Sequence, residues 1–159
     1  MTHPPHQILR LGPDHIAEMR ALNAVFAAAF EDPDSYTAAP PSDAELRQRL
    51  SQPSVIALVA VLDETVVGGL VAYEIEKLEQ ARREIYIYDL ATAAPARRRG
   101  IATALVRHLQ QIATDRAATA LYVQTEPDDT AAIALYAGLG SRLDVLHFDL
   151  DLNTKGPTA

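Results

Sequence analysis

The segment Arg97-Arg98-Arg99-Gly100-Ile101-Ala102 has the residue types and spacing of a phosphate-binding loop. It follows an apolar run typical of a strand and opens a stretch, to Ile112, whose apolar residues have helical spacing. The first N–H groups of a helix have no partner within it and carry partial positive charge, so they can hold phosphate oxygens. Gly100 would let the backbone approach such a ligand, and the arginines would add charge. The segment therefore favours a diphosphate ligand.

Other interpretations of the three arginines fit the sequence less well. The nucleotide-binding patterns G-x-x-x-x-G-K-[ST] and G-x-G-x-x-G are both absent from the sequence. A nucleic-acid patch is disfavoured because the run is short, lacks interleaved aromatic residues and belongs to a chain of net charge −7. A solvated charge run remains the alternative, and the position between strand and helix speaks against it.

The elements that must position this loop follow from hydrophobic periodicity and from turn and capping residues. Ser42 and Glu45 form a capping-box pattern, and Asp14 is expected to cap the first helix. Residues 31–41, with three prolines, are expected to form an exposed loop. Strands are expected at residues 6–11, 55–62, 65–73, 84–91, 120–125 and 141–150. Helices are expected at residues 14–30, 42–52, 101–112 and 131–139.

Composition limits the classes of protein further. A chain of 159 residues that is 48% hydrophobic suits one domain over 1–159, with flexible ends at 1–5 and 152–159. The absence of cysteine excludes thiol nucleophiles and thiolate metal sites, and no metal site is expected. Apolar runs of about eight residues are too short to span a membrane. We therefore expect a soluble cytoplasmic protein that binds neither membranes nor nucleic acid.

The pattern Arg97-x-x-Gly100-x-Ala102 resembles the Arg/Gln-x-x-Gly-x-Gly/Ala motif that follows the fourth strand of Gcn5-related N-acetyltransferases. The expected order of strands and helices is also similar over nearly the whole chain. The stretches EQARREIYIYDLA, RRRGIATALV, LYVQ, ALY and HFDLD resemble aminoglycoside 3-N-acetyltransferases of type I. The resemblance implies an α/β (α+β) fold, with a mixed, mostly antiparallel sheet of six to seven strands that is splayed at strands 4 and 5 and flanked by about four helices.

The resemblance also implies acetyl-CoA as co-substrate. Its pyrophosphate would lie on the backbone of residues 99–103, and its pantetheine arm would run along the splayed strand. A bulge in that strand would free the backbone N–H of Leu90 to act as an oxyanion donor near the thioester. The cofactor-binding residues expected from this are Leu90, Ala91, Thr92, Arg97, Arg98, Arg99, Gly100, Ile101, Ala102 and Thr103.

The acceptor amine must lose a proton before it attacks, since aliphatic amines have pKa values of about 10.4. Asp89 is the first candidate for the proton acceptor, because a strand of Ile, Tyr and Leu seldom carries an unpaired carboxylate. Its alternative role is a strand-end acid bonded to backbone or arginine. Glu84 is the second candidate, with an ion pair to Arg82 or Arg83 as its alternative, and a water relay is a third route. Tyr136 is expected to protonate the departing thiolate, or else to be a core residue.

The resemblance implies acetylation of the 3-amino group of gentamicin-like aminoglycosides by direct transfer in a ternary complex, which would confer antibiotic resistance. Acids would hold the cationic acceptor and Tyr36 would contact it or cover the core. The expected substrate-binding residues are Asp89, Glu84, Tyr36, Glu126, Asp128 and Asp149. A polyamine, small metabolite or peptide amine is the alternative acceptor, and a non-enzymatic acyl-CoA sensor is the alternative function. A homodimer is expected.

Overall fold

The computed structural model describes residues 5–152 and divides them into two compact units, one ending at Glu126 and one beginning at Pro127. The expectation of one domain over the whole chain stays a prediction. The flexible ends expected at 1–5 and 152–159 lie outside the described residues, apart from positions 5 and 152. Within the described part of the chain, no helix is both long and apolar enough to cross a bilayer.

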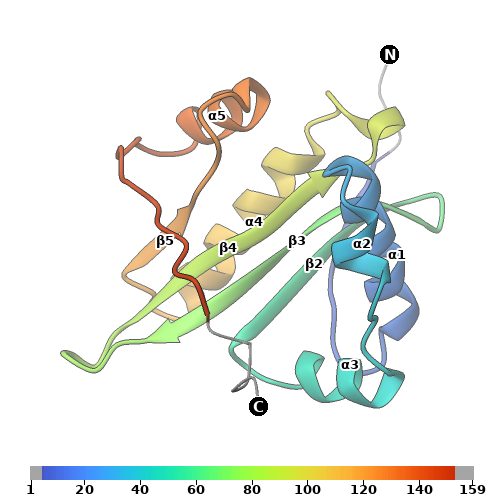
Figure 1. The fold of residues 1–159 in the computed structure, drawn as a ribbon, viewed down its shortest axis with the longest axis horizontal. Coiled ribbons are helices and arrows are strands. Elements are labelled where there is room, and N and C mark those ends of the chain that lie inside the picture. Colours follow the sequence, from blue (N-terminus) through green and yellow to red (C-terminus); the bar gives the residue numbers. More distant parts are fainter. Residues whose placement is uncertain (1–4, 153–159) are drawn as a thin grey trace, which may run out of the picture. The chain divides into compact units, whose positions relative to one another are not determined.

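The first unit is built on one five-stranded sheet whose strands lie side by side in chain order (Figure 1). Neighbouring strands from the first to the fourth are antiparallel, and the fourth and fifth are parallel. The strands are β1 (Gln7–Arg10), β2 (Val55–Leu62), β3 (Thr65–Glu76), β4 (Arg83–Thr92) and β5 (Ala120–Val123). The parallel step requires a crossover connection, which helix α4 (Ile101–Asp115) supplies.

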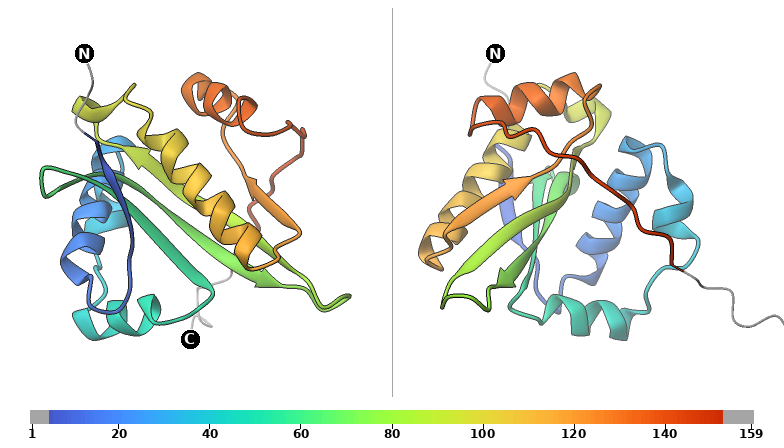
Figure 2. Two further views of the ribbon diagram at one scale, coloured as in Figure 1. Left: turned by 180° about the vertical axis from the view of Figure 1, so that it is seen from behind. Right: turned by 60° about the vertical axis from the view of Figure 1, so that its left-hand side comes forward.

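Helices cover both faces of the sheet. The helices α1 (Ile16–Ala29), α2 (Pro33–Thr37) and α3 (Asp43–Leu50) lie on one face, and α4 lies on the other, as the front and back views show (Figures 1 and 2). Leu22 and Phe26 of α1 are fully buried in the core of the first face. Leu105 and Leu109 of α4 are fully buried as well. A sheet covered on both faces explains the blurred apolar alternation of its central strands.

Close packing of α1 on the sheet depends on Gly69. A Cβ at this position would overlap the carbonyl oxygen of Leu58 and would lie 2.6 Å from Cδ1 of Leu22. A larger residue would therefore push α1 away from the strands. Since α1 leads directly into α2, this contact also sets where α2 lies above β4.

Several expectations for the first unit are confirmed. The fold class is α/β, β2 spans the predicted residues, and β4 differs from the prediction by one residue at each end. Ser42 and Glu45 form the predicted capping box. Asp14 was wrong as the cap of α1: His15 is the N-cap residue, and its Nδ1 accepts a hydrogen bond of 2.8 Å from the N–H of Gly12.

The loop expected at residues 31–41 is also partly wrong, because it contains the five-residue helix α2. Asp32 caps this helix by accepting a hydrogen bond from the N–H of Ser35, and Pro33 occupies its first turn, where the missing N–H costs nothing. The chain therefore has five α-helices in its described part instead of about four.

The second unit contains α5 (Thr130–Ala137), capped by Asp129, which accepts a hydrogen bond from the N–H of Ala132. The strand expected at residues 141–150 is wrong: residues 141–152 pair with no other strand within the described chain, so the sheet has five strands instead of six to seven. Alternating apolar residues form a strand only where a neighbour takes up their backbone hydrogen bonds. Here the apolar side chains remain exposed, as at Leu143, Leu146, Phe148 and Leu150.

Candidate active site

A bulge in β4 determines where Asp89 points. Val71 of β3 pairs with Asp89, whereas the next residue, Ala72, pairs with Ile87. Tyr88 is therefore an extra residue of β4 that has no partner on β3. In a regular strand Asp89 would share a face with Ile85 and Ile87, which are buried. The extra residue turns Asp89 to the opposite face, where α1 and α3 lie.

The sheet opens directly after the same point. β4 and β5 are paired from Glu84 and Ala120 to Ile87 and Val123, and the pairing stops there. The rest of β4 keeps β3 on one edge and, among the described residues, has no paired strand on the other. The splay expected between strands 4 and 5 is thus confirmed.

Backbone N–H groups of β4 point into this opening. Ala93 donates its N–H to the carbonyl of Val67 at 2.8 Å, on the β3 side. Because N–H directions alternate along a strand, the N–H groups of Leu90 and Thr92 point to the open edge. Among the described residues, the buried side-chain Oγ1 of Thr92 has no hydrogen-bond partner, and it lies next to Gly68 of β3. The edge thus offers donors that an extended ligand can use as a strand would.

The loop after β4 ends in the exposed N-terminus of α4. Arg98 and Gly100 both have left-handed φ values, of 60° and 75°, and Gly100 is the N-cap residue. The first helical hydrogen bond runs from the N–H of Ala104 to the carbonyl of Gly100, at 3.0 Å. The N–H groups of Ile101, Ala102 and Thr103 therefore lack acceptors within the helix.

The space beside this loop suits an anion. A Cβ on Gly100 would meet no atom within 4 Å, so the backbone there faces open space. Arg97 and Arg98 are exposed and Arg99 is half-buried, and the Nε of Arg97 lies 3.4 Å from the carbonyl oxygen of Thr92. Backbone donors and positive charge thus meet at one place, which is what a diphosphate requires.

Asp89 lines a cavity of about 200 Å³ on the α1 and α3 face of the sheet. Burial raises the pKa of its carboxyl group above the ordinary value, and a hydrogen bond from Tyr36 partly opposes that rise. The Oη of Tyr36 donates to Oδ1 of Asp89 at 3.0 Å. The other lining residues are Met19, Asn23, Phe26, Pro41, Leu46, Arg49, Leu50, Val55, Ala57, Val71 and Tyr73. A half-buried carboxylate beside an open cavity can bind an ammonium group and accept its proton.

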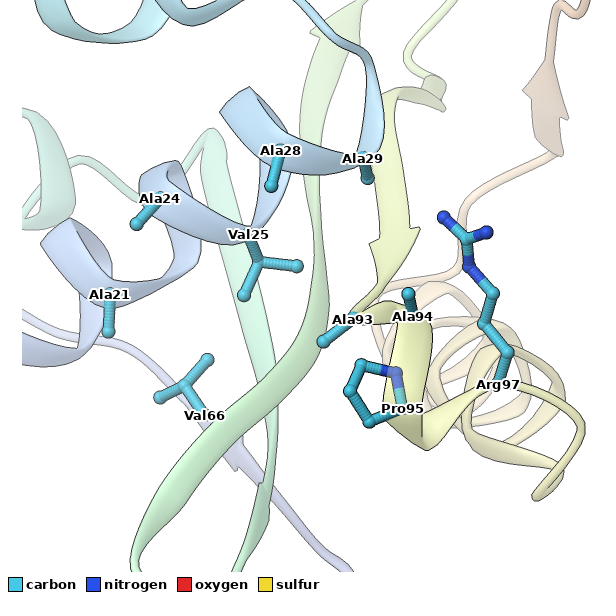
Figure 3. A pocket seen from close by; sticks show the side chains of 10 residues that line it. All are labelled: Ala21, Ala24, Val25, Ala28, Ala29, Val66, Ala93, Ala94, Pro95 and Arg97. Carbon is cyan, nitrogen blue, oxygen red and sulfur yellow. The ribbon is translucent and has the colours of Figure 1, made fainter.

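A larger cavity, of about 490 Å³, lies between α1 and the segment that follows β4 (Figure 3). Its walls are small apolar side chains, among them Ala24 and Ala28 of α1 and Pro95 opposite them. Among the residues that the structure describes, Arg97 is the one charged residue of its lining. Of the two cavities, the one at Asp89 has a carboxylate in its lining and can therefore pair with an ammonium group.

The two other predicted acids of the first unit have different surroundings from Asp89. Glu84 accepts a hydrogen bond of 2.7 Å from Arg82, which is the ion pair considered as its alternative role. It lies five residues from Asp89 along β4, roughly 16 Å in an extended strand. Glu126 is exposed at the end of the unit. The structure therefore brings Tyr36 and Asp89 together and leaves Glu84 in a separate ion pair.

Three of the predicted site residues belong to the second unit, and their roles stay predictions. Tyr136 lies on α5 and is half-buried. The carbonyl of Asp128 accepts a hydrogen bond from the N–H of Thr130 in the turn before that helix. Asp149 Oδ1 lies 2.9 Å from Nε2 of His147. Within residues 5–152, no three His, Asp or Glu side chains gather into a metal-binding group.

Sequence reasoning missed a row of tyrosines that runs across β3, β4 and β5. The rings of Tyr73 and Tyr88 make an edge contact at 6.0 Å, those of Tyr88 and Tyr86 another at 5.9 Å, and Tyr86 stacks on Tyr122 at 5.1 Å. Tyr73 also lines the cavity at Asp89. Regular alternation along β4 already places Tyr86 and Tyr88 on one face. It assigns Asp89 to the opposite face, and it does not show which residues of β3 and β5 lie beside the tyrosines.

Comparison with known proteins gives a consistent result. A family model described as the acetyltransferase (GNAT) family matches residues 20–140. The structure resembles that of an aminoglycoside acetyltransferase, HMB0005, from an uncultured soil metagenomic sample, with a TM-score of 0.90 and 46% sequence identity over 94% of this chain and 99% of that one.

More distant relatives are also named as acetyltransferases. An aminoglycoside acetyltransferase, meta-AAC0020, from an uncultured soil metagenomic sample was solved in complex with sisomicin; it is 27% identical over 93% of this chain and 97% of that chain, with a TM-score of 0.86. The rat protein N-acetyltransferase 8B is 34% identical over 82 residues, which are 52% of this chain and 37% of that protein. The matched stretch thus spans about a third of the length of the curated relatives.

Proposed function

Since the chain belongs to the GNAT family of acetyltransferases, we propose that it transfers the acetyl group of acetyl-CoA to an amine of an aminoglycoside. The observation that supports an aminoglycoside as the acceptor is the similarity to the aminoglycoside acetyltransferase HMB0005, which covers 94% of this chain and 99% of that one. The half-buried carboxylate of Asp89 beside an open cavity supports it, because the acceptor groups of an aminoglycoside are ammonium ions.

Acetyl-CoA would bind to the loop and to the open edge of β4. The free N–H groups at the start of α4, with Arg97, Arg98 and Arg99 around them, would hold the pyrophosphate. The pantetheine arm would lie along residues 90–92 and take the place of a strand. The N–H of Leu90 points to that edge and would donate to the thioester oxygen as negative charge develops on it.

The transfer would then proceed directly from acetyl-CoA to the acceptor. The ammonium group of the acceptor gives a proton to Asp89, and the free amine attacks the thioester carbon. A C–N bond forms, the C–S bond breaks, and the thiolate of coenzyme A leaves. Tyr136 would supply the proton that the thiolate takes up, and its phenolate would take the second proton, which the nitrogen loses as the amide forms. The chain has no cysteine to form an acyl-enzyme by thiol chemistry, which supports transfer in a ternary complex.

The position that we propose is acetylated is the 3-amino group of gentamicin-like aminoglycosides. It rests on the sequence resemblance to the 3-N-acetyltransferases of type I, and it makes antibiotic resistance the expected consequence of the activity. Glu84, Glu126, Asp128 and Asp149 would attract and hold the other ammonium groups, helped by the net charge of −7. A cytoplasmic homodimer is part of the same proposal.

The test is coenzyme A release from acetyl-CoA by the purified chain, measured in parallel with gentamicin, kanamycin, spermidine and a short peptide. We expect turnover with gentamicin, and mass spectrometry with fragmentation should place one acetyl group on the 3-amino nitrogen. Turnover confined to spermidine or the peptide would contradict the aminoglycoside assignment. Binding of acetyl-CoA without turnover on any amine would favour an acyl-CoA sensor.

A further inference from the structure

Tyr36 and Asp89 are joined by a hydrogen bond although they are 53 residues apart in the chain. Oη of Tyr36 donates to Oδ1 of Asp89 at 3.0 Å in a partly buried setting. Oδ2 of Asp89 has no hydrogen-bond partner in the part of the chain that the structure describes. One oxygen of the carboxylate is therefore held by the protein, and the other is left for a ligand.

The position of Tyr36 is itself well supported. Its ring packs against Phe26 and Phe30 of the α1 region, with ring centroids 5.8 and 6.0 Å away. The short helix that carries it is anchored by Asp32, which accepts hydrogen bonds from both the N–H and the Oγ of Ser35, at 3.2 and 2.6 Å. Two aromatic contacts and a capped helix hold the hydroxyl in one place above β4.

We propose that Tyr36 is a positioning residue for Asp89: its hydroxyl fixes Oδ1 and thereby leaves Oδ2 turned to the cavity, where it accepts the proton of the acceptor ammonium group. This inference rests on the proposed acetyl transfer, which it deepens, and assigns Tyr36 to the carboxylate instead of to the substrate. The five-residue helix then has a role in the site, because it carries the hydrogen-bond donor.

The other groups around Asp89 do not take over the positioning role that we propose for Tyr36. From α3, Arg49 lines the same cavity, and its own ion pair is with Glu45, at 3.9 Å. From the strands, Tyr73 lines the same cavity, and Tyr88 is the residue before Asp89 on β4. Burial, and then the nearby Asp89, raise the pKa of the Tyr73 phenol, and burial raises that of Tyr86, so both phenols stay neutral. From α1, the cavity residues are Met19, Asn23 and Phe26, which do not titrate.

The hydrogen bond from Tyr36 is thus the contact that stabilises the ionised carboxylate against burial. Burial raises the pKa of Asp89, and the bond from Tyr36 lowers it. Burial and the neighbouring carboxylate raise the pKa of Tyr36 far above its ordinary value, so its hydroxyl stays protonated and keeps donating.

The test compares Tyr36→Phe with the wild type over a pH series. Phenylalanine keeps the ring and its packing, so the change removes only the hydroxyl. The Asp89 pKa should rise by about one unit, because the carboxylate loses a hydrogen-bond donor. The acid limb of the pH profile of kcat/KM for the acceptor should move to higher pH by the same amount. At pH values below the limb the rate should fall about tenfold, while the KM for acetyl-CoA stays unchanged. Tyr122→Phe, an exposed tyrosine on β5, is the matched control.

An acid limb at the same pH in Tyr36→Phe and Tyr122→Phe would overturn the positioning role. A carbon-13 NMR titration of the Asp89 carboxyl, assigned with Asp89→Asn, tests the same point without turnover. If no amine is acetylated but the Asp89 pKa still rises in Tyr36→Phe, the proposed function has failed and the role of Tyr36 in holding the carboxylate stands. An unchanged Asp89 pKa contradicts that role in either case.

Discussion

The loop at residues 97–103 and the cavity at Asp89 are two halves of one candidate site, built in different ways. The loop offers backbone N–H groups from consecutive residues, arranged by the left-handed Gly100 and the start of α4. The cavity offers side chains from two helices and three strands, and its carboxylate accepts a hydrogen bond from Tyr36, 53 residues away. Backbone recognition suits the invariant phosphates of a common donor, whereas side-chain recognition suits a variable acceptor.

The difference predicts that single side-chain changes damage the acceptor half most. Asp89→Asn removes the proposed proton acceptor and keeps the shape of the side chain. We expect kcat to fall by about 10²- to 10⁴-fold, the range of general base catalysis. Calorimetry should show acetyl-CoA binding within about twofold of the wild type, since the change leaves the loop backbone intact.

Glu84→Gln is the comparison variant for that experiment. Glu84 is paired with Arg82, and its loss should lower kcat much less than the loss of Asp89. An equal or larger loss in Glu84→Gln would make Glu84 the proton acceptor and would remove Asp89 from that role.

In the loop half, the backbone itself must be changed to obtain a large effect. Gly100→Val places a branched side chain at a φ of 75°, which costs roughly 1–2 kcal/mol, and points it into the open space in front of the loop. The KM for acetyl-CoA should rise about tenfold or more, with the acceptor KM nearly unchanged. Gly100→Ala should have an intermediate effect, and an acceptor KM that rises as much as that for acetyl-CoA would contradict the separation of the two halves.

The smallest effect is expected from a side chain in the loop. Arg99→Ala removes one charge and keeps the backbone donors, so the KM for acetyl-CoA should rise only a few-fold at low salt. The difference from the wild type should shrink at high salt, where exposed charges are screened. A loss as large as that in Gly100→Val, persisting at high salt, would mean that the arginine side chain and not the backbone holds the phosphates.

The same contrast explains what could be predicted from the sequence. The loop, β2 and the Ser42 capping box depend on residues that are close in the chain, and all three were predicted. Tyr36 and Asp89 were both named as site residues, but their hydrogen bond depends on the docking of α2 and on a bulge in β4 that reverses the face of Asp89. Neither the docking nor the bulge is encoded in local periodicity.

The terminal segment shows an error of the opposite kind, in which a local pattern predicted an element that the fold lacks. Residues 141–150 have the alternation of a strand, yet a strand also needs a partner, and the sequence does not specify one. Similarly, the helix in residues 33–37 was hidden by a composition rich in proline and acid, since Pro33 and Asp32 are as typical of a helix start as of a loop.

The most direct test of the two-half site is an initial-rate study in which acetyl-CoA and gentamicin are varied together. If each half holds its own substrate and the acetyl group passes directly between them, double-reciprocal plots should intersect, and the intact mass of the protein should not change with acetyl-CoA alone. Parallel lines, with a mass gain of one acetyl group on the protein, would contradict direct transfer in a ternary complex.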